Sequence, residues 1–277
     1  MPMILYDASL NGVSIHTLAE EIILRDIVEN PASMDVKTVN RAMSPGMLET
    51  SRTRRKLEID LVCVIYTQDS RRRAEIASMI TAWANEGGWL TVNTRPGVGL
   101  RVRPGQTPGQ GSSLRWQEDI TISLTAYEIP YWEEEGLGAT ISFGTEWDDA
   151  VGMYVGSRVI RPNGNTGTVP VTCFAFNMAE ATTPLTHLKI VVDHTTMEFE
   201  DMHIDGGGVL GGWFEIAYDE NGLLNIRNIK SEDSSLMRYR TAESNDDLLA
   251  RCNKDNQIHV YSDAMVNITF YAKGRWL

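Results

Sequence analysis

Long apolar runs are absent from this sequence of 277 residues. None approaches the roughly 20 apolar residues that a transmembrane helix needs, so a membrane span is not expected. The N-terminal segment lacks the basic start and the long apolar stretch of a secretory signal. We therefore expect a protein that stays where it is made, or leaves the cell by lysis.

Cysteine and positive charge are also scarce. The cysteines Cys63, Cys173 and Cys252 lie far apart, and two of them fall in apolar strand patterns. Reduced thiols in the core are the favoured interpretation, with a redox or metal role as the alternative. Lysine and arginine total 25 against 37 acidic residues, a formal net charge of −12. This balance argues against a nonspecific nucleic-acid binder, because neutralising phosphates needs surplus positive charge.

Helical periodicity extends over one long segment, and a patterned strand leads into it. Apolar and polar residues alternate over residues 56–65, which predicts a strand with one buried face. Asp69 or Ser70 can cap the helix that follows, and Gly87 can end it. The apolar residues at helical spacing are Ile76, Ala77, Ile80, Trp83 and Ala84. We expect the strand and the helix to pack as one unit.

Positive charge is concentrated on either side of this strand. Residues 38–53 are interpreted as an extended loop or the tip of a long hairpin, which can reach a neighbouring subunit. Three arginines open the helix: Arg71, Arg72 and Arg73. They oppose the helix dipole at a cost of about 0.3–1 kcal/mol each, unless acidic groups offset them. Those groups are either Asp69 and Glu75 of the same helix or carboxylates of another chain.

The remaining elements are predicted to be strands. In the first half they cover residues 4–6, 13–15, 22–28, 89–93, 100–102 and 120–126. In the second half they cover residues 139–143, 168–176, 188–192, 196–199, 213–218, 223–229, 257–261 and 266–271. Strands at this density, without a long helix, predict a β-sandwich. The acidic run Glu133-Glu134-Glu135-Gly136 is interpreted as an exposed linker between two domains, residues 1–135 and 136–277.

A glycine motif in the second half matches a nucleotide-binding fingerprint. Gly206, Gly208 and Gly211 satisfy the pattern GxGxxG. A strand pattern follows the motif, whereas a bound phosphate needs a helix N-terminus there. We therefore expect a loop between sandwich strands and no nucleotide cofactor.

Histidine and acidic residues gather near the same loop. They are His194, Glu198, Glu200, Asp201, His203 and Asp205. No spacing among them is diagnostic of a metal site, and a solvated acidic loop is favoured over metal ligands. No nucleophile motif is present either. The residues thus predict a binding or assembly protein, with no catalytic residue, no metal and no cofactor.

Short segments along the whole chain carry a resemblance to a known family. They are Arg54-Arg55-Lys56-Leu57-Glu58-Ile59 with the helix after it, residues 120–126 leading to Ile129-Pro130-Tyr131-Trp132, and the ending Asn256-Gln257-Ile258-His259-Val260, residues 268–271 and Arg275-Trp276-Leu277. In this order they resemble the distal tail proteins of long-tailed, siphovirus-type bacteriophages, which join the tail tube to the host-adhesion apparatus.

The resemblance implies a mainly β fold with two domains. Residues 1–135 would form a β-barrel-like, tail-tube-like domain with one α-helix, which assembles into a hexameric ring around the DNA channel. Residues 136–277 would form a galectin-like or carbohydrate-module-like β-sandwich that projects outward. Arg71, Arg72 and Arg73 are then the candidate ring interface.

The resemblance also implies partners and a location. The chain would bind further copies of itself, the tail tube protein and tail-tip or adhesin proteins, with DNA only as cargo through an acidic lumen. It would be made in the host cytoplasm and reside at the virion tail tip. Two other functions stay open: a carbohydrate-binding adhesin acting through the second domain, and a glycan-cleaving enzyme that uses carboxylates of residues 198–205. Trp147, Trp213 and Trp276 are scattered in the sequence, so core packing is expected for each, and a sugar platform is not.

Overall fold

The computed structural model describes residues 6–30, 34–40, 47–106, 119–180, 182–219, 222–230 and 235–277. The chain divides into two units, Met1–Glu133 together with Leu277, and Glu134–Trp276. The separate roles expected of two domains stay a prediction. Among the described residues, no helix is long and apolar enough to cross a membrane. Of the predicted strand at residues 4–6, residues 4 and 5 lie outside the described ranges, and Tyr6 precedes the first strand.

The first unit is built on antiparallel strands in the order β2-β1-β7-β8-β9-β6-β3. Their bounds are β1 Ala8–Leu10, β2 Val13–Ser14, β3 Ile22–Asn30, β6 Leu57–Ile65, β7 Gly88–Val92, β8 Val98–Gln106 and β9 Asp119–Ala126. Strand β8 belongs to two sheets, because residues 99–102 pair with β7 and residues 103–106 pair with β9. This shared strand turns one sheet into the next, in the barrel-like manner expected.

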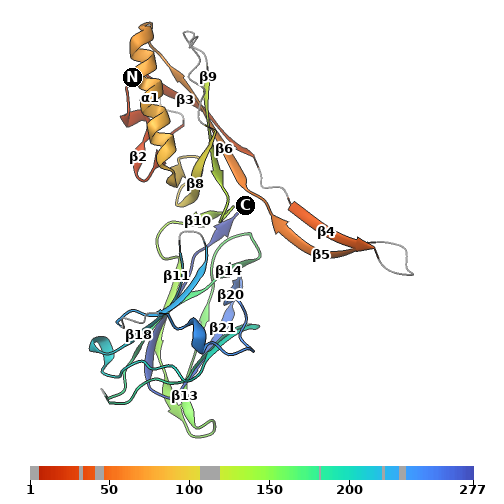
Figure 1. Ribbon diagram of the computed structural model, residues 1–277, viewed down its shortest axis with the longest axis vertical. Coiled ribbons are helices and arrows are strands. Elements are labelled where there is room, and N and C mark those ends of the chain that lie inside the picture. The colour runs from red at the N-terminus through yellow and green to blue at the C-terminus, as the bar shows by residue number, and fades with distance from the viewer. Residues whose placement is uncertain are drawn as a thin grey trace. The chain divides into compact units, whose positions relative to one another are not determined.

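The predicted strand and helix both form and contact each other in this unit (Figure 1). Strand β6 lies between β3 and β9, and its odd-numbered residues from Leu57 to Cys63 are buried. Helix α1, Ser70–Glu86, contacts β6 and β8. All five apolar residues predicted to line its inner face are buried: Ile76, Ala77, Ile80, Trp83 and Ala84. The Trp83 indole also donates a hydrogen bond to the Val13 carbonyl at 3.0 Å. The strand–helix prediction is confirmed.

Both ends of α1 follow from its sequence. The Asp69 carboxylate caps the first turn by accepting a hydrogen bond from the Arg71 amide at 2.9 Å. At the other end Gly87 and Gly88 have positive φ angles of 61° and 117°. The Asn11 side chain donates to the Gly87 carbonyl and accepts from the Trp89 amide, both at 2.9 Å. A Cβ on Gly88 would lie 2.2 Å from the Asn11 amide oxygen, so this close approach requires glycine.

A long hairpin stands outside this sheet. Strands β4, Met34–Asn40, and β5, Met47–Arg54, pair with each other in antiparallel register. Among the described residues they pair with no third strand. The segment at residues 38–53 is therefore mostly strand, as the hairpin alternative predicts, while residues 41–46 lie outside the described ranges.

The acidic run is exposed at Glu135 and Gly136, but not over its whole length as was expected. Trp132–Glu134 forms strand β10, in which Trp132 and Glu133 are buried. The Glu134 amide donates to the Gly274 carbonyl at 2.9 Å, and the Glu134 carboxylate accepts from the Gly274 amide at 3.1 Å. The expectation of exposure was wrong for Glu133 and Glu134, because Glu133 is buried and Glu134 has backbone and side-chain partners.

The second unit is a β-sandwich of two five-stranded sheets, in the orders β11-β22-β15-β18-β19 and β12-β13-β21-β16-β17. The bounds of the first sheet are β11 Ala139–Gly144, β15 Thr172–Asn177, β18 Trp213–Tyr218, β19 Leu224–Asn228 and β22 Val266–Ala272. Those of the second are β12 Glu146–Asp148, β13 Met153–Ile160, β16 Leu188–Val192, β17 Thr195–Phe199 and β21 Asn256–Ser262. Three short strands complete the unit: β14 Thr168–Pro170, β20 Leu249–Arg251 and β23 Arg275–Trp276. The mainly β fold with a C-terminal β-sandwich is confirmed.

Side chains from both sheets fill the sandwich core. Phe199 of one sheet meets Phe214 of the other edge to face, with ring centroids 5.1 Å apart, and both are fully buried. The expected strand at residues 168–176 is in fact two strands, since β14 pairs with β20 and β15 pairs with β18 and β22. Strands β12, β13 and β20 were not predicted from the sequence.

The three cysteines are free and buried, so the prediction of reduced core thiols is confirmed. Burial raises the pKa of the Cys63 thiol to about 12, with a smaller contribution from the charge of Asp119. Burial also raises the pKa of Cys173. Thiols held in this protonated state are poor nucleophiles and poor metal ligands.

Candidate functional surfaces

The three arginines that open α1 have partners within their own chain. Arg72 pairs with Glu21 at 2.9 Å and with Glu75 at 3.7 Å, and Arg71 pairs with Glu75 at 3.5 Å. The hydrogen bond from Arg72 lowers the pKa of the Glu21 carboxyl. Both Glu75 pairs span three or four positions of the helix, the spacing at which helical side chains meet.

Arg73 differs from its two neighbours because its side chain points into the unit. It is 6% exposed, and its guanidinium donates to the Thr67 carbonyl at 2.5 Å. Arg71, by contrast, has an 89% exposed side chain. Partners in the same chain therefore offset the dipole of α1, and Arg71 is the arginine best placed to meet another chain. A role of these arginines in a ring stays a prediction.

The β4–β5 hairpin is a second candidate contact surface. Asp35, Val36 and Lys37 of β4 are all exposed, and Val36 is 42% exposed. A two-stranded sheet is marginally stable by itself in water, and each unpaired edge presents backbone groups that a further strand can bond. The hairpin thus offers an edge and an apolar side chain to a neighbour.

The glycine motif forms no phosphate site. Gly208 begins a three-residue 3₁₀ turn, Gly208–Leu210, and strand β18 begins three residues after the turn, at Trp213. A Cβ on Gly206 would lie 2.0 Å from the Glu180 carbonyl oxygen, and one on Gly211 would lie 2.3 Å from that of Gly206. Close backbone packing accounts for these two glycines, in the loop between strands that the sequence predicts.

The histidine and acidic residues separate into two places. His203 and Asp205 pair at 3.2 Å, and both side chains are about 70% exposed, at 68% and 71%. His194 lies in the turn between β16 and β17, where Thr195 begins the second strand. The structure does not bring His194 to His203 or Asp205 as ligands of one ion.

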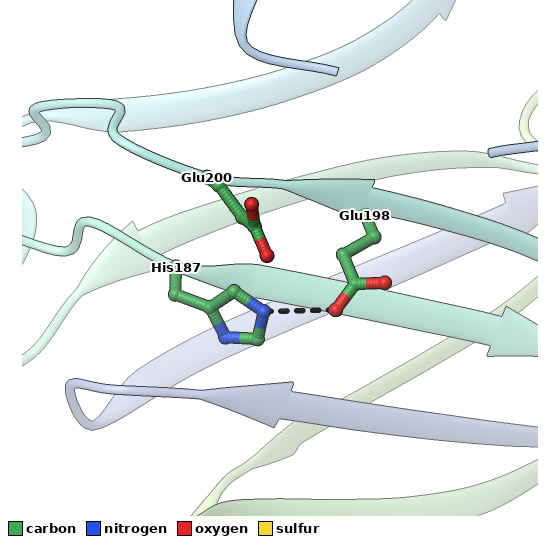
Figure 2. Close-up of side chains that lie close together, drawn as sticks. All are labelled: His187, Glu198 and Glu200. Atoms are coloured by element: carbon green, nitrogen blue, oxygen red, sulfur yellow. Dashed lines mark hydrogen bonds and ion pairs between the residues drawn. The ribbon is translucent and has the colours of Figure 1, made fainter. Parts of the chain in front are cut away.

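A cluster that the sequence reasoning missed lies on the β16–β17 hairpin. Among the described residues, His187, Glu198 and Glu200 form one group whose potential ligand atoms lie within 4.8 Å of one another. Figure 2 shows the three side chains on the same side of the hairpin. The His187 Nε2 atom lies 3.0 Å from Glu198 Oε1, and Lys189 Nζ donates to Glu198 Oε2 at 3.1 Å. The two-residue turn after Val192 could have predicted this cluster from the sequence. The length of a hairpin turn sets the register of its strands, and the register decides which side chains meet across them.

These contacts weigh against Glu198 as the general acid of a glycan-cleaving enzyme. Burial raises the pKa of its carboxyl, but hydrogen bonds and charge from His187 and Lys189 outweigh burial and lower it overall. A general acid for glycoside cleavage needs a raised pKa, so that it still carries its proton near neutrality. Glu198 has the opposite property.

Aromatic side chains gather on the outer face of the other sheet, contrary to the expectation that the tryptophans pack in the core. Trp213 meets Phe174 edge to face at 4.8 Å between centroids and lies 6.1 Å from Phe176. Lys230 lies over the Trp213 ring at 4.8 Å. All three rings are partly exposed, and Trp147 elsewhere is 55% exposed. The expectation failed because it considered the tryptophans alone, whereas Trp213 meets Phe174 and Phe176 of a neighbouring strand, where they alternate with the buried Cys173 and Ala175.

Comparisons with known proteins identify the fold. No protein-family profile matches the sequence, and no curated protein matches it significantly. Among solved structures, the SPP1 Dit (gp 19.1) protein, described as a paradigm of the hub adsorption apparatus in phages that infect Gram-positive bacteria, matches with a TM-score of 0.64 at 10% identity. The match covers 97% of this chain and 99% of that one. A chain of the phage P2 baseplate in its activated conformation gives a TM-score of 0.43 at 10% identity, over 92% of this chain and 97% of that one. Over nearly its whole length, the chain has the fold of the SPP1 Dit phage protein.

Proposed function

We propose that this chain is the structural distal tail protein of a long-tailed bacteriophage. The observation that carries the proposal is the likeness to SPP1 Dit over nearly the full length of both chains, through the sheet with its single described α-helix and through the β-sandwich. A shared sandwich alone would be weak support, since sandwiches host many functions. Likeness over two successive domains of different architecture is more specific.

In this role the first unit forms a ring, hexameric by analogy, that joins the tail tube to tail-tip or adhesin proteins. The β4–β5 hairpin supports assembly, because a neighbouring copy would supply the contacts that a lone two-stranded sheet lacks. The net charge of −12 suits a channel through which DNA passes without binding. The chain acts at the virion tail tip as a structural component and not as an enzyme.

Mass in solution and electron microscopy of the purified protein test this proposal. We expect ring-shaped particles whose mass is a multiple of 30.9 kDa, six copies for a hexamer. Since the hairpin contact is intermolecular, the ring fraction should rise with protein concentration. Particles that remain at the mass of one chain at every concentration, with and without a purified tail tube protein, would contradict ring formation.

A carbohydrate-binding adhesin is the second candidate, and the outer aromatic face favours it. Phe174, Phe176 and Trp213 present partly exposed rings, and beside them Glu215 and Arg227 form an ion pair. Aromatic rings with adjacent charged hydrogen-bonding groups suit a sugar, which has both apolar and hydroxyl-bearing surfaces. A glycan array measures sugar binding directly. If the parent chain binds a glycan and Phe174→Ala does not, the adhesin function is supported. If the parent chain binds no glycan on the array, the adhesin function is contradicted.

A further inference from the structure

The cluster on the β16–β17 hairpin has the composition of a metal site. His187 supplies an imidazole nitrogen, and Glu198 and Glu200 supply carboxylate oxygens, the donor atoms that Zn²⁺ accepts beside water. Their ligand atoms already lie within 4.8 Å of one another. Hard cations such as Ca²⁺ prefer six to eight oxygens, so an imidazole in a set of three favours a transition metal.

Strand register places these ligands on one face. Leu188 pairs with Phe199 and Lys189 pairs with Glu198, so continuing the register by one residue sets His187 opposite Glu200. Side chains alternate between faces, which puts all three ligands on the side opposite Leu188 and Phe199. Those two residues are fully buried in the sandwich core, and a slip by one residue would expose them. The core therefore fixes the strands that carry the ligands.

Further contacts hold Glu198 in position. The Glu198 amide donates to the Ser244 hydroxyl at 2.9 Å, and that hydroxyl donates to the Glu198 carbonyl at 3.1 Å. Lys189 orients one carboxylate oxygen, while the other faces His187. Outer contacts of this kind orient metal ligands and increase affinity. Glu200 is exposed, so its side chain can move onto an ion at little cost.

We propose that His187, Glu198 and Glu200 bind one divalent transition-metal ion of the Zn²⁺ class, with water at the fourth position. In tetrahedral Zn²⁺ sites the ligand bonds of about 2.0–2.2 Å set neighbouring ligand atoms roughly 3.3–3.5 Å apart. The separation of 3.0 Å between His187 and Glu198 needs only a small opening to admit the ion. Binding replaces the present hydrogen bond, and the ring hydrogen resides on Nδ1 when Nε2 ligates. The ion would join the ends of two neighbouring strands.

Calorimetry on the full chain, with Zn²⁺ as the ligand and Ca²⁺ as the comparison, tests the site. We expect one Zn²⁺ per chain and no Ca²⁺ binding at the same concentration. His187→Asn and Glu200→Gln should each weaken Zn²⁺ binding by about tenfold or more, since even outer-shell changes commonly cost that much. Glu200 is exposed, so Glu200→Gln leaves the fold intact and keeps the test clear. Co²⁺ in place of Zn²⁺ should give the visible absorption of a tetrahedral site, lost in both variants.

His203 and Asp205 provide the matched control. They are also a histidine and a carboxylate in contact, at 3.2 Å, but both are well exposed, and no third ligand among the described residues joins them. His203→Asn should leave the affinity for Zn²⁺ unchanged. Failure of the parent chain to bind Zn²⁺, or an equal loss in His187→Asn and His203→Asn, would overturn the proposal.

Discussion

Arg95 and Glu29 form a two-point ion pair, with Nε–Oε1 and Nη2–Oε2 distances of 2.8 Å each. The Arg95 guanidinium also lies over the Trp132 ring at 5.2 Å, and the Trp132 indole donates to Glu29 Oε2 at 3.3 Å. Glu29 lies one residue before the end of strand β3, and Arg95 follows β7, so the group connects two distant parts of the first unit. Trp132 is fully buried, which leaves its N–H no access to water.

Glu29→Ala should therefore destabilise the first unit. It removes the acceptor for two charged hydrogen bonds and for the buried indole, a loss of roughly 1–3 kcal/mol in the free energy of unfolding. Urea titration followed by tryptophan fluorescence measures the change. Asp119→Ala is the control, because its pair with Arg25 is about half exposed and should contribute about 0–1 kcal/mol. Equal effects of the two substitutions would show that Glu29 contributes no more than a surface pair.

The helix arginines should separate into folding and assembly effects. Arg73→Ala should lower the stability of the isolated chain, because the Arg73 guanidinium is buried and donates to Thr67. Arg71→Glu should leave the thermal midpoint nearly unchanged and reduce the ring fraction, since Arg71 is the most exposed of the three. Sedimentation at low and high salt, beside thermal melts, measures both quantities. A ring insensitive to Arg71→Glu at every salt concentration would place this arginine in solvent.

Replacing residues 34–54 with a short Gly-Ser connection should give a chain that folds but no longer forms rings. The hairpin pairs only with itself among the described residues, so its removal takes no partner strand from the sheets of the first unit. Thermal melting and mass in solution are the measurements. A deletion variant that still forms the parent assembly would assign the ring contacts to other surfaces of the first unit.

Glu198 should make the second unit sensitive to acid. Its folded-state pKa is lowered from the ordinary value of 4.5, so its ionised form stabilises the fold above that value. This contribution is lost as the pH falls through 4.5 toward the lowered folded-state pKa. Thermal melts between about pH 7 and pH 3 should show a smaller drop for Glu198→Gln than for the parent chain. If the thermal midpoints of the two proteins fall equally as the pH is lowered, the pKa of Glu198 does not differ between the folded and unfolded states.

The three thiols should be protected in the native chain. Cys63, Cys173 and Cys252 are buried, and burial raises the pKa of the first two. Iodoacetamide at mildly alkaline pH should modify them slowly in buffer and completely in denaturant, as mass spectrometry can count. Rapid modification of Cys63 in buffer would show that strand β6 opens locally.

The helices and strands that could be predicted are those whose apolar and polar residues alternate regularly within one continuous segment. Strand β6 and helix α1 keep their periods because each has one buried face. Strand β13 was missed because the opposite sheet interrupts its pattern: a Cβ on Gly156 would lie 2.7 Å from the Phe143 ring, and Arg158 lies over the same ring at 5.8 Å. A glycine and an arginine therefore occupy positions where a strand pattern has apolar residues, for a reason that lies in another segment.

The candidate sites, too, could be predicted only as far as they depend on a single segment. The sequence indicates Glu198 and Glu200 as candidate ligands, but it groups them with His203 and Asp205, which are close in the chain. In the structure, His203 and Asp205 pair with each other and do not belong to the Glu198 and Glu200 cluster. The actual neighbour of Glu198 and Glu200, His187, comes from the adjacent strand. Trp213 likewise meets Phe174 only through the pairing of β15 with β18. Proximity across strands depends on register, which the alternation of a single strand does not contain.

The sharing of strand β8 between two sheets couples their local stability. Opening either sheet to solvent exposes amides of the same strand, so neither sheet can unfold alone without straining the other. Amide hydrogen exchange in β7, β8 and β9 should thus proceed through one common opening reaction, with similar protection along all three strands. A force applied to one sheet would be carried directly into the other.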